Sequence, residues 1–138
     1  MEHLVNKVIK QARSFLGVRY QWGGNSYMGI DCSGLIQEAF KAIGVMLPRI
    51  AGDQAKTGSF VEIDELQPGD LVFFTDQPGN TTITHVGMVT KPDYDKNSVI
   101  FIHASTAQGV VEDDLLKPWW QELYLTASRP HIFKPIAS

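Results

Sequence analysis

Apolar residues recur at helical spacing in two segments of the N-terminal third of the chain. In residues 4–16, the leucine, valine, isoleucine, alanine and phenylalanine side chains share one helical face, and Gly17 follows as a candidate helix end. The spacing in residues 35–43 predicts a second helix, which Gly44 ends and whose first turn contains Cys32. Residues 17–31 lie between these helices and are rich in glycine and aromatic residues, so we expect a loop there.

The apolar pattern changes to that of β-strands after residue 60. A turn centred on Pro68-Gly69 precedes the wholly apolar stretch L-V-F-F. The pattern predicts strands at 71–74, 85–90, 98–105 and 123–129, and a short helix near Gln54. Helices followed by consecutive strands predict one α+β domain over residues 1–138, with N-terminal helices packed on an antiparallel sheet.

Composition and charge narrow the classes of function. The 138 residues are 43% hydrophobic and 20% charged, which is enough apolar material for a packed core. A net charge of -3 without a basic run speaks against nucleic acid or an anionic membrane as the main partner. No stretch reaches the roughly 20 apolar residues of a membrane span. Because the chain has one cysteine, an internal disulfide is excluded. We also expect the protein to be a monomer.

Two histidines occupy related positions in the strands predicted at 85–90 and 98–105. If the hairpin is symmetric about Tyr94, residue 90 pairs with 98, 88 with 100 and 86 with 102. His85 then lies directly opposite His103, with β-carbons about 4.5–5.5 Å apart. A slip of one residue would separate the two imidazoles, so this prediction depends on the register.

A thiol and two adjacent imidazoles are the parts of a nucleophilic site. One imidazole can take the proton of a thiol, and the second can hold the first in the correct tautomer. Cys32 begins a predicted helix, where the helix dipole favours the thiolate and lowers the pKa of cysteine. Two other interpretations are a buried, inert thiol and a Cys-His-His zinc site. We do not favour zinc, because the sequence shows no spare carboxylate or water-activating motif near these residues.

Six motifs give the chain a resemblance to the NlpC/P60 family of bacterial cell-wall cysteine peptidases. They are Y-Q-W-G-G (20–24), D-C-S-G-L (31–35), L-P-R (47–49), L-Q-P-G-D-L-V-F-F (66–74), H-V-G-M-V (85–89) and F-I-H-A-S (101–105), in the family's order. The resemblance implies a reduced papain-like fold. It also implies cleavage of peptidoglycan stem peptides between γ-D-glutamate and a diamino acid, either meso-diaminopimelate or lysine, without a metal or cofactor. By matching motifs, Cys32 is the nucleophile, His85 the general base and His103 the orienting residue.

The resemblance also implies a set of residues that contact the substrate. Tyr20 matches a tyrosine that positions substrate and supports the oxyanion. Asp31 and Ser33 match positions that contact the amine and backbone of the L-alanine end, although Asp31 is equally a candidate helix N-cap. Arg49 belongs to a motif that lines the cleft and is a substrate-binding candidate without an assigned contact. Trp22 is expected to pack within its own loop.

Two other classes of function remain open at the level of the sequence. One is a non-catalytic module that binds wall peptides, and the other is an amidase, deamidase or acyltransferase on the same scaffold. We expect a bacterial protein of the cell envelope, or a secreted one, whose leader is absent from this sequence. Recycling of wall fragments in the cytoplasm is the alternative. Many relatives have a wall-binding domain before the catalytic one, and these 138 residues leave no room for it.

Overall fold

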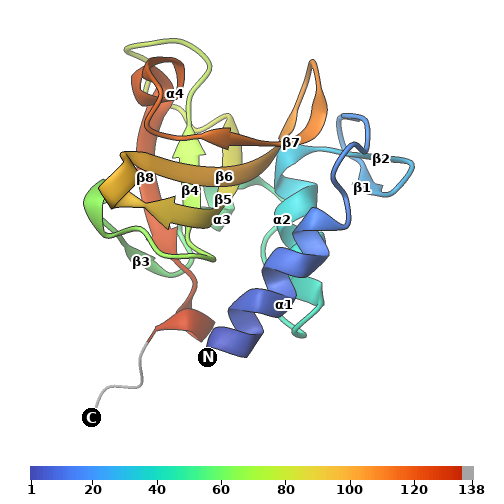
Figure 1. The fold of residues 1–138 in the computed structure, drawn as a ribbon. Coiled ribbons are helices and arrows are strands. Elements are labelled where there is room, and N and C mark those ends of the chain that lie inside the picture. Colours follow the sequence, from blue (N-terminus) through green and yellow to red (C-terminus); the bar gives the residue numbers. More distant parts are fainter. Residues whose placement is uncertain (135–138) are drawn as a thin grey trace.

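The helices and strands of the computed structural model, which describes residues 1–134, form two packed layers (Figure 1). The helices are α1 (Glu2–Arg13), α2 (Cys32–Lys41), α3 (Ala51–Gln54) and α4 (Pro118–Leu123), with 3-10 turns at Ile63–Glu65, Tyr94–Lys96 and His131–Phe133. The strands are β1 (Asn25–Ser26), β2 (Gly29–Ile30), β3 (Ser59–Phe60), β4 (Leu71–Phe74), β5 (His85–Asp93), β6 (Ser98–Ser105), β7 (Gly109–Asp114) and β8 (Tyr124–Arg129). Within the described residues, no helix is long and apolar enough to cross a bilayer.

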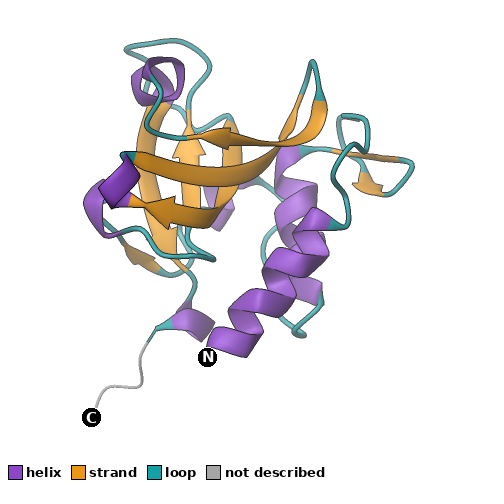
Figure 2. Ribbon diagram, viewed as in Figure 1, coloured by secondary structure: helices purple, strands orange, loops and turns teal. Residues whose placement is uncertain are grey.

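A six-stranded antiparallel sheet with the order β3-β8-β4-β5-β6-β7 forms one layer, and α1 and α2 lie together against one of its faces (Figure 2). The predicted α+β class, with N-terminal helices on an antiparallel sheet and Cys32 at the start of a helix, is confirmed. Helix α2 packs on β5 and β6, which are the two strands that hold the histidines. The core therefore sets the position of the cysteine relative to the histidine strands.

Strand β4 shows why a continuous apolar run was needed at the centre of the sheet. Successive side chains of a strand point to opposite faces. Leu71 and Phe73 pack in the core between the sheet and the helices, whereas Val72 and Phe74 pack in a second core on the other face. Both faces of this strand are buried, so all four residues are apolar.

The strands predicted at 71–74 and 98–105 are confirmed with those bounds, and the short helix near Gln54 is α3. The strand predicted at 85–90 is also confirmed but continues to Asp93, and the last strand begins at Tyr124. Four strands and one helix were not predicted: β1 and β2, which lie in the segment expected to be a loop, and β3, β7 and α4. Of these, β7 matters most for the site described below.

The symmetric register predicted for the β5–β6 hairpin is wrong. Met88 pairs with Ile102 rather than with residue 100. The pairing also changes within β5, because the register shifts by one residue between Val89 and Lys91. This irregularity is a β-bulge, in which one strand has an extra residue.

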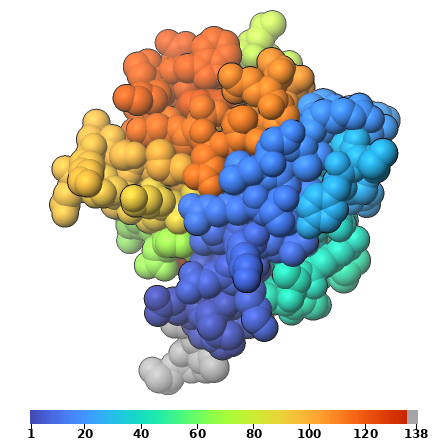
Figure 3. All heavy atoms as spheres, turned by 45° about the vertical axis from the view of Figure 1, so that its right-hand side comes forward, coloured from blue at the N-terminus to red at the C-terminus, as the bar shows by residue number. Residues whose placement is uncertain are grey.

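The segment after α1 covers the outer edge of the sheet at β7. Gly17 donates its N–H to the carbonyl of Val110, and Val110 in turn donates its N–H to the carbonyl of Val18. Arg13 forms an ion pair of 2.8 Å with Glu112 on the same strand. Figure 3 shows this N-terminal segment in blue against the orange strands. An exposed edge strand has unpaired backbone groups, and these contacts satisfy part of them.

Candidate active site

Cys32 is the first residue of α2, and the preceding residue fixes the start of that helix. Asp31 is the N-cap, with extended backbone angles, and its Oδ1 accepts a hydrogen bond of 2.8 Å from the N–H of Gly34. Carboxylates are among the preferred N-caps because they satisfy helix N–H groups that lack an intrahelical partner. The capping role predicted for Asp31 is confirmed, and it places the sulfur at the positive end of the helix dipole.

The thiol is more buried than its position at a helix start suggested. Cys32 is 9% exposed. Burial raises the pKa of the Cys32 thiol above its ordinary value, although the backbone N–H of Val86 acts in the opposite direction. The prediction that the helix dipole lowers the pKa of Cys32 is therefore wrong. The loss of solvent around the buried thiol outweighs the effect of the dipole.

The two predicted histidines meet, although by a different pairing. His85 Nε2 and His103 Nδ1 lie 2.8 Å apart, and their rings are perpendicular. Because Met88 pairs with Ile102, His85 and His103 are diagonal neighbours on one face rather than directly opposed residues. Diagonal neighbours remain within reach of long or aromatic side chains. The predicted contact is confirmed, whereas the register from which we inferred it is not.

A carboxylate that sequence reasoning missed completes this chain of side chains. His103 Nε2 lies 2.7 Å from Asp113 Oδ2. Strand β7 pairs His103 with Val111, and Asp113 follows two residues later on the same face. The signal that could have revealed this strand is Gly109 followed by Val110 and Val111, directly after the histidine strand.

These contacts determine the tautomers of both histidines. A carboxylate accepts hydrogen bonds, so His103 donates from Nε2 to Asp113 and leaves its Nδ1 as an acceptor. His85 must then donate from Nε2 to His103 Nδ1, which leaves its own Nδ1 free to accept a proton.

Burial, with a smaller contribution from His103, lowers the pKa of His85 to about 3. Burial also lowers the pKa of His103, although Asp113 acts against it. At rest the site therefore holds a neutral thiol and neutral imidazoles.

The thiol of Cys32 lies near Tyr20 and near the start of β5, where His85 is located. The N–H of Val86, the residue after His85, favours the thiolate of Cys32. Burial and then the nearby Cys32 raise the pKa of the Tyr20 hydroxyl. Tyr20 and Cys32 line one cavity of about 530 Å3, whereas both histidines and Asp113 line another of about 500 Å3. Thr84 lines both cavities, so the two adjoin at the start of β5.

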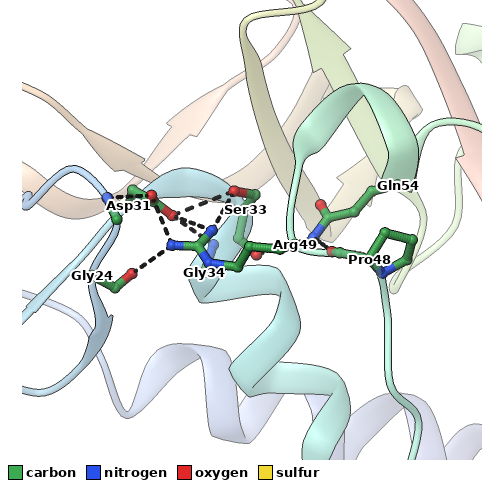
Figure 4. A network of polar contacts seen from close by, with 8 residues as sticks. Gly24, Asp31, Ser33, Gly34, Pro48, Arg49 and Gln54 are labelled. Atoms are coloured by element: carbon green, nitrogen blue, oxygen red, sulfur yellow. Dashed lines mark hydrogen bonds and ion pairs between the residues drawn. The ribbon is translucent and has the colours of Figure 1, made fainter.

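The other three predicted site residues form one polar network at the wall of the thiol cavity (Figure 4). Arg49 donates to both carboxylate oxygens of Asp31, at 3.0 and 2.9 Å, and to the hydroxyl of Ser33 at 2.7 Å. The N–H groups of Gly23 and Gly34 also donate to Asp31. A carboxylate has about four acceptor sites, so Arg49 would have to move before Asp31 could bind a substrate amine.

Neighbouring residues hold Arg49 against the start of α2. Gln54, which is fully buried, donates its side-chain amide to the carbonyls of Ser33 and Pro48 (Figure 4). Gly34 has no room for a side chain, since a β-carbon there would collide with the carbonyl oxygen of Gly24. The D-C-S-G and L-P-R motifs are therefore parts of one packed unit.

The tryptophans near the site differ in their roles. Trp22 is 85% exposed at the rim of the thiol cavity, so the prediction that it packs within its loop is wrong. Trp120 packs between Phe74 and the two histidines, with its ring 4.8 Å from that of His103. Trp119 is 68% exposed and lines the cavity of the histidines. One tryptophan therefore supports the imidazoles, and the other faces solvent beside them.

One of the two reasons against a zinc site is wrong. A carboxylate does lie near the histidines, because Asp113 contacts His103. The geometry provides a different argument. His85 Nε2 and His103 Nδ1 bond to one another, and His103 Nε2 bonds to Asp113, so three of the four ring nitrogens are already engaged. In the described part of the chain, no group of three or more histidine, cysteine or acidic side chains is arranged to hold a metal ion.

Comparison with known proteins places most of the chain in one family. The profile of the NlpC/P60 family matches residues 17–129. The γ-D-glutamyl-L-lysine dipeptidyl-peptidase of Bacillus subtilis (strain 168) is 48% identical over 81 residues, which is 59% of this chain and 27% of that protein. The murein DD-endopeptidase MepS/murein LD-carboxypeptidase of Escherichia coli (strain K12) is 37% identical over 125 residues, or 90% of this chain and 62% of that protein.

Solved structures agree with this similarity. A crystal structure of an NlpC/P60 family protein from Bacillus cereus ATCC 10987 matches with a TM-score of 0.79 and 32% sequence identity. That match covers 91% of this chain and 39% of the other. This chain thus spans only part of the length of these similar proteins.

Proposed function

Because this chain belongs to the NlpC/P60 family, we propose that it is a cysteine peptidase that hydrolyses peptidoglycan stem peptides at the bond between γ-D-glutamate and a diamino acid. The observation that supports this most is the hydrogen-bonded series Asp113–His103–His85 beside a cysteine at a helix start. The γ-D-glutamyl bond is favoured by the 48% identity to a γ-D-glutamyl-L-lysine dipeptidyl-peptidase.

The neutral resting state defines the first chemical step. As the sulfur of Cys32 attacks the γ-glutamyl carbonyl carbon, the free Nδ1 of His85 accepts the thiol proton. A carbon–sulfur bond forms, and the carbonyl oxygen becomes an oxyanion. The backbone N–H of Cys32 and the hydroxyl of Tyr20 are the donors for this oxyanion. One such donor contributes about 3 kcal/mol to stabilisation of a related transition state.

The second half of the reaction returns the proton. The imidazolium of His85 protonates the leaving amine as the carbon–nitrogen bond breaks, which leaves a thioester on Cys32. His85 then takes a proton from water, whose oxygen attacks the thioester carbon. As the carbon–sulfur bond breaks, His85 returns this proton to the sulfur, which releases the acid and restores the thiol. His103 and Asp113 do not touch the reacting atoms in this scheme. They keep Nδ1 of His85 bare and stabilise its charged form.

The test is product analysis with defined substrates. We expect the purified protein to split L-Ala-γ-D-Glu-L-Lys-D-Ala into L-Ala-γ-D-Glu and L-Lys-D-Ala, which mass spectrometry identifies. Parallel incubation with intact sacculi will distinguish a protein of the cell envelope, which acts on polymeric wall, from one that recycles free fragments. Binding of the peptide without any products would contradict the proposal and favour a non-catalytic binding module.

A second candidate function is cleavage of D,D-bonds in cross-linked peptides. It is favoured by the 37% identity, over 90% of this chain, to a protein named as a DD-endopeptidase and LD-carboxypeptidase. The same catalytic residues would serve, because both reactions transfer an acyl group from an amine to Cys32 and then to water. A cross-linked dimer of stem peptides separates the two functions, since D,D-cleavage returns monomers with intact γ-D-glutamyl bonds.

Replacing Asp113 by asparagine will test the positioning role of this carboxylate. We expect kcat to fall about tenfold to 100-fold, less than the roughly 10⁴-fold loss known for a carboxylate bonded directly to a catalytic imidazole. KM should change less than kcat, because the Oδ2 atom of Asp113 is engaged by His103 and not by the substrate. The measurement is steady-state kinetics together with ¹⁵N chemical shifts of the imidazoles.

The ¹⁵N shifts separate a positioning role from a merely structural one. In the parent protein, His103 should have its proton on Nε2 and a bare Nδ1. The amide that Asp113→Asn introduces is a weaker acceptor than the carboxylate, so the His103 tautomers should mix while the fold persists. An unchanged kcat with unchanged tautomers would refute the role of Asp113.

A further inference from the structure

The cavity lined by both histidines and Asp113 lies beside the thiol cavity, on the histidine side of the site. It has a volume of about 500 Å3 and adjoins the thiol cavity at Thr84. Under the proposed function, the leaving amine must receive its proton from His85, so the leaving group lies on the histidine side of the sulfur. The acyl group then occupies the thiol cavity. The histidine-side cavity is therefore positioned to hold the diamino acid.

The walls of this cavity are chemically asymmetric. One part is apolar, because Phe74, Trp119, Trp120 and Leu123 line it. Two carboxylates, Asp76 and Asp113, also line it, and no lysine or arginine is among the lining residues. An apolar surface next to a carboxylate suits an alkyl chain that ends in a cation, since the methylenes can pack while the charge is paired.

The two carboxylates differ in their availability. Asp113 Oδ2 is engaged by His103. Asp76 is exposed, and its Oδ1 accepts weak hydrogen bonds of 3.4 Å from Thr75 and 3.3 Å from Asn80. Within residues 1–134, Asp76 Oδ2 has no hydrogen-bond partner, and Asp76 forms no ion pair. Asp76 is thus the better acceptor for a charged ligand.

We propose that this cavity binds the side chain of the leaving diamino acid, that the methylenes pack on Trp119, and that Asp76 accepts the distal ammonium group. This inference rests on the proposed function and adds a specificity determinant to it. The ligand class is an L-diamino acid whose distal amine is free, as in a stem peptide that is not cross-linked. A cross-linked amine is an amide and has no charge for Asp76 to pair with.

Two tripeptides test this inference with the unaltered protein. One is L-Ala-γ-D-Glu-L-Lys, and the other has norleucine, which keeps the alkyl chain without the ammonium, in place of lysine. We expect kcat/KM to be at least about tenfold higher for the lysine peptide, as is typical of a charge-assisted hydrogen bond. Equal cleavage of both peptides would overturn the inference and leave the proposed function intact. Cleavage of neither would remove the proposed function and this inference with it.

A matched pair of variants then assigns the preference to one residue. Asp76→Asn should reduce the preference for lysine to within about threefold, because cleavage of the lysine peptide slows much more than cleavage of the norleucine peptide. Asp64→Asn is the control, because Asp64 is also exposed but does not line the cavity. If Asp76→Asn keeps the full preference for lysine, Asp76 is not the acceptor.

Discussion

Replacing Cys32 with alanine is expected to reduce kcat for the stem peptide by at least about 10⁴-fold, close to the uncatalysed background. The sulfur is the atom that forms the thioester, and the chain contains no other thiol that could replace it. Nucleophile and base act as a unit in such sites, so removal of either removes most of the catalysis. The measurement is release of L-Ala-γ-D-Glu over a long incubation at high enzyme concentration.

The fold should survive this change. The side chain of Cys32 is small and the residue begins a helix whose cap is the preceding Asp31, so the thermal unfolding midpoint should change little. The variant should also still bind the peptide in equilibrium dialysis. Activity within tenfold of the parent would show that Cys32 is not the nucleophile, and the proposed mechanism would fail.

Replacing Arg49 with methionine is expected to lower the free energy of unfolding by about 2–3 kcal/mol. Methionine keeps an unbranched stem but removes the donors to both oxygens of Asp31, which is nearly buried. Breaking a fully buried pair costs about 3–5 kcal/mol because it leaves one charge unpaired. The side chain of Arg49 is 35% exposed, so solvent reduces this cost. Chemical denaturation at pH 7 measures the change.

Arg13→Met provides the matched control. Arg13 forms a single ion pair with Glu112, and both side chains are substantially exposed. Exposed pairs contribute about 0–1 kcal/mol, so this variant should be near the parent in stability. If Arg49→Met destabilises the protein no more than Arg13→Met does, the Asp31–Arg49 pair does not stabilise the fold in the way described here.

The parts of the fold that sequence analysis predicted well are those with local, periodic signals. The continuous apolar runs of β4 and β6 are short and rich in β-branched and aromatic residues, so both strands were placed at their observed bounds. The motif D-C-S-G gave both a cap and a helix start, and Asp31 and Cys32 occupy those positions. The contact between His85 and His103 was also predicted, but from a symmetric register that the bulge in β5 makes wrong.

The parts that were missed depend on contacts between distant segments. Strand β7 ends in three acidic residues, and acidic residues are uncommon in strands, so composition argued against it. Its pairing with β6 overrides that preference and brings Asp113 to His103. The Asp31–Arg49 contact joins positions 18 residues apart through tertiary packing alone. The raised pKa of the Cys32 thiol likewise reflects burial, which no local pattern reports.

The bulge in β5 changes which side chains of the β5–β6 hairpin lie on the same face. In a regular hairpin, the number of residues at the tip decides which face every later side chain takes. Here the extra residue near Thr90 lies between the tip and the base of the hairpin. The pairing at the base therefore differs by one residue from the pairing at the tip. If the pairing of Lys91 with Ile100 continued without the extra residue, Met88 would lie opposite His103, and the side chains of His85 and His103 would point to opposite faces of the hairpin. The extra residue is thus what brings both imidazoles to one side of the ribbon.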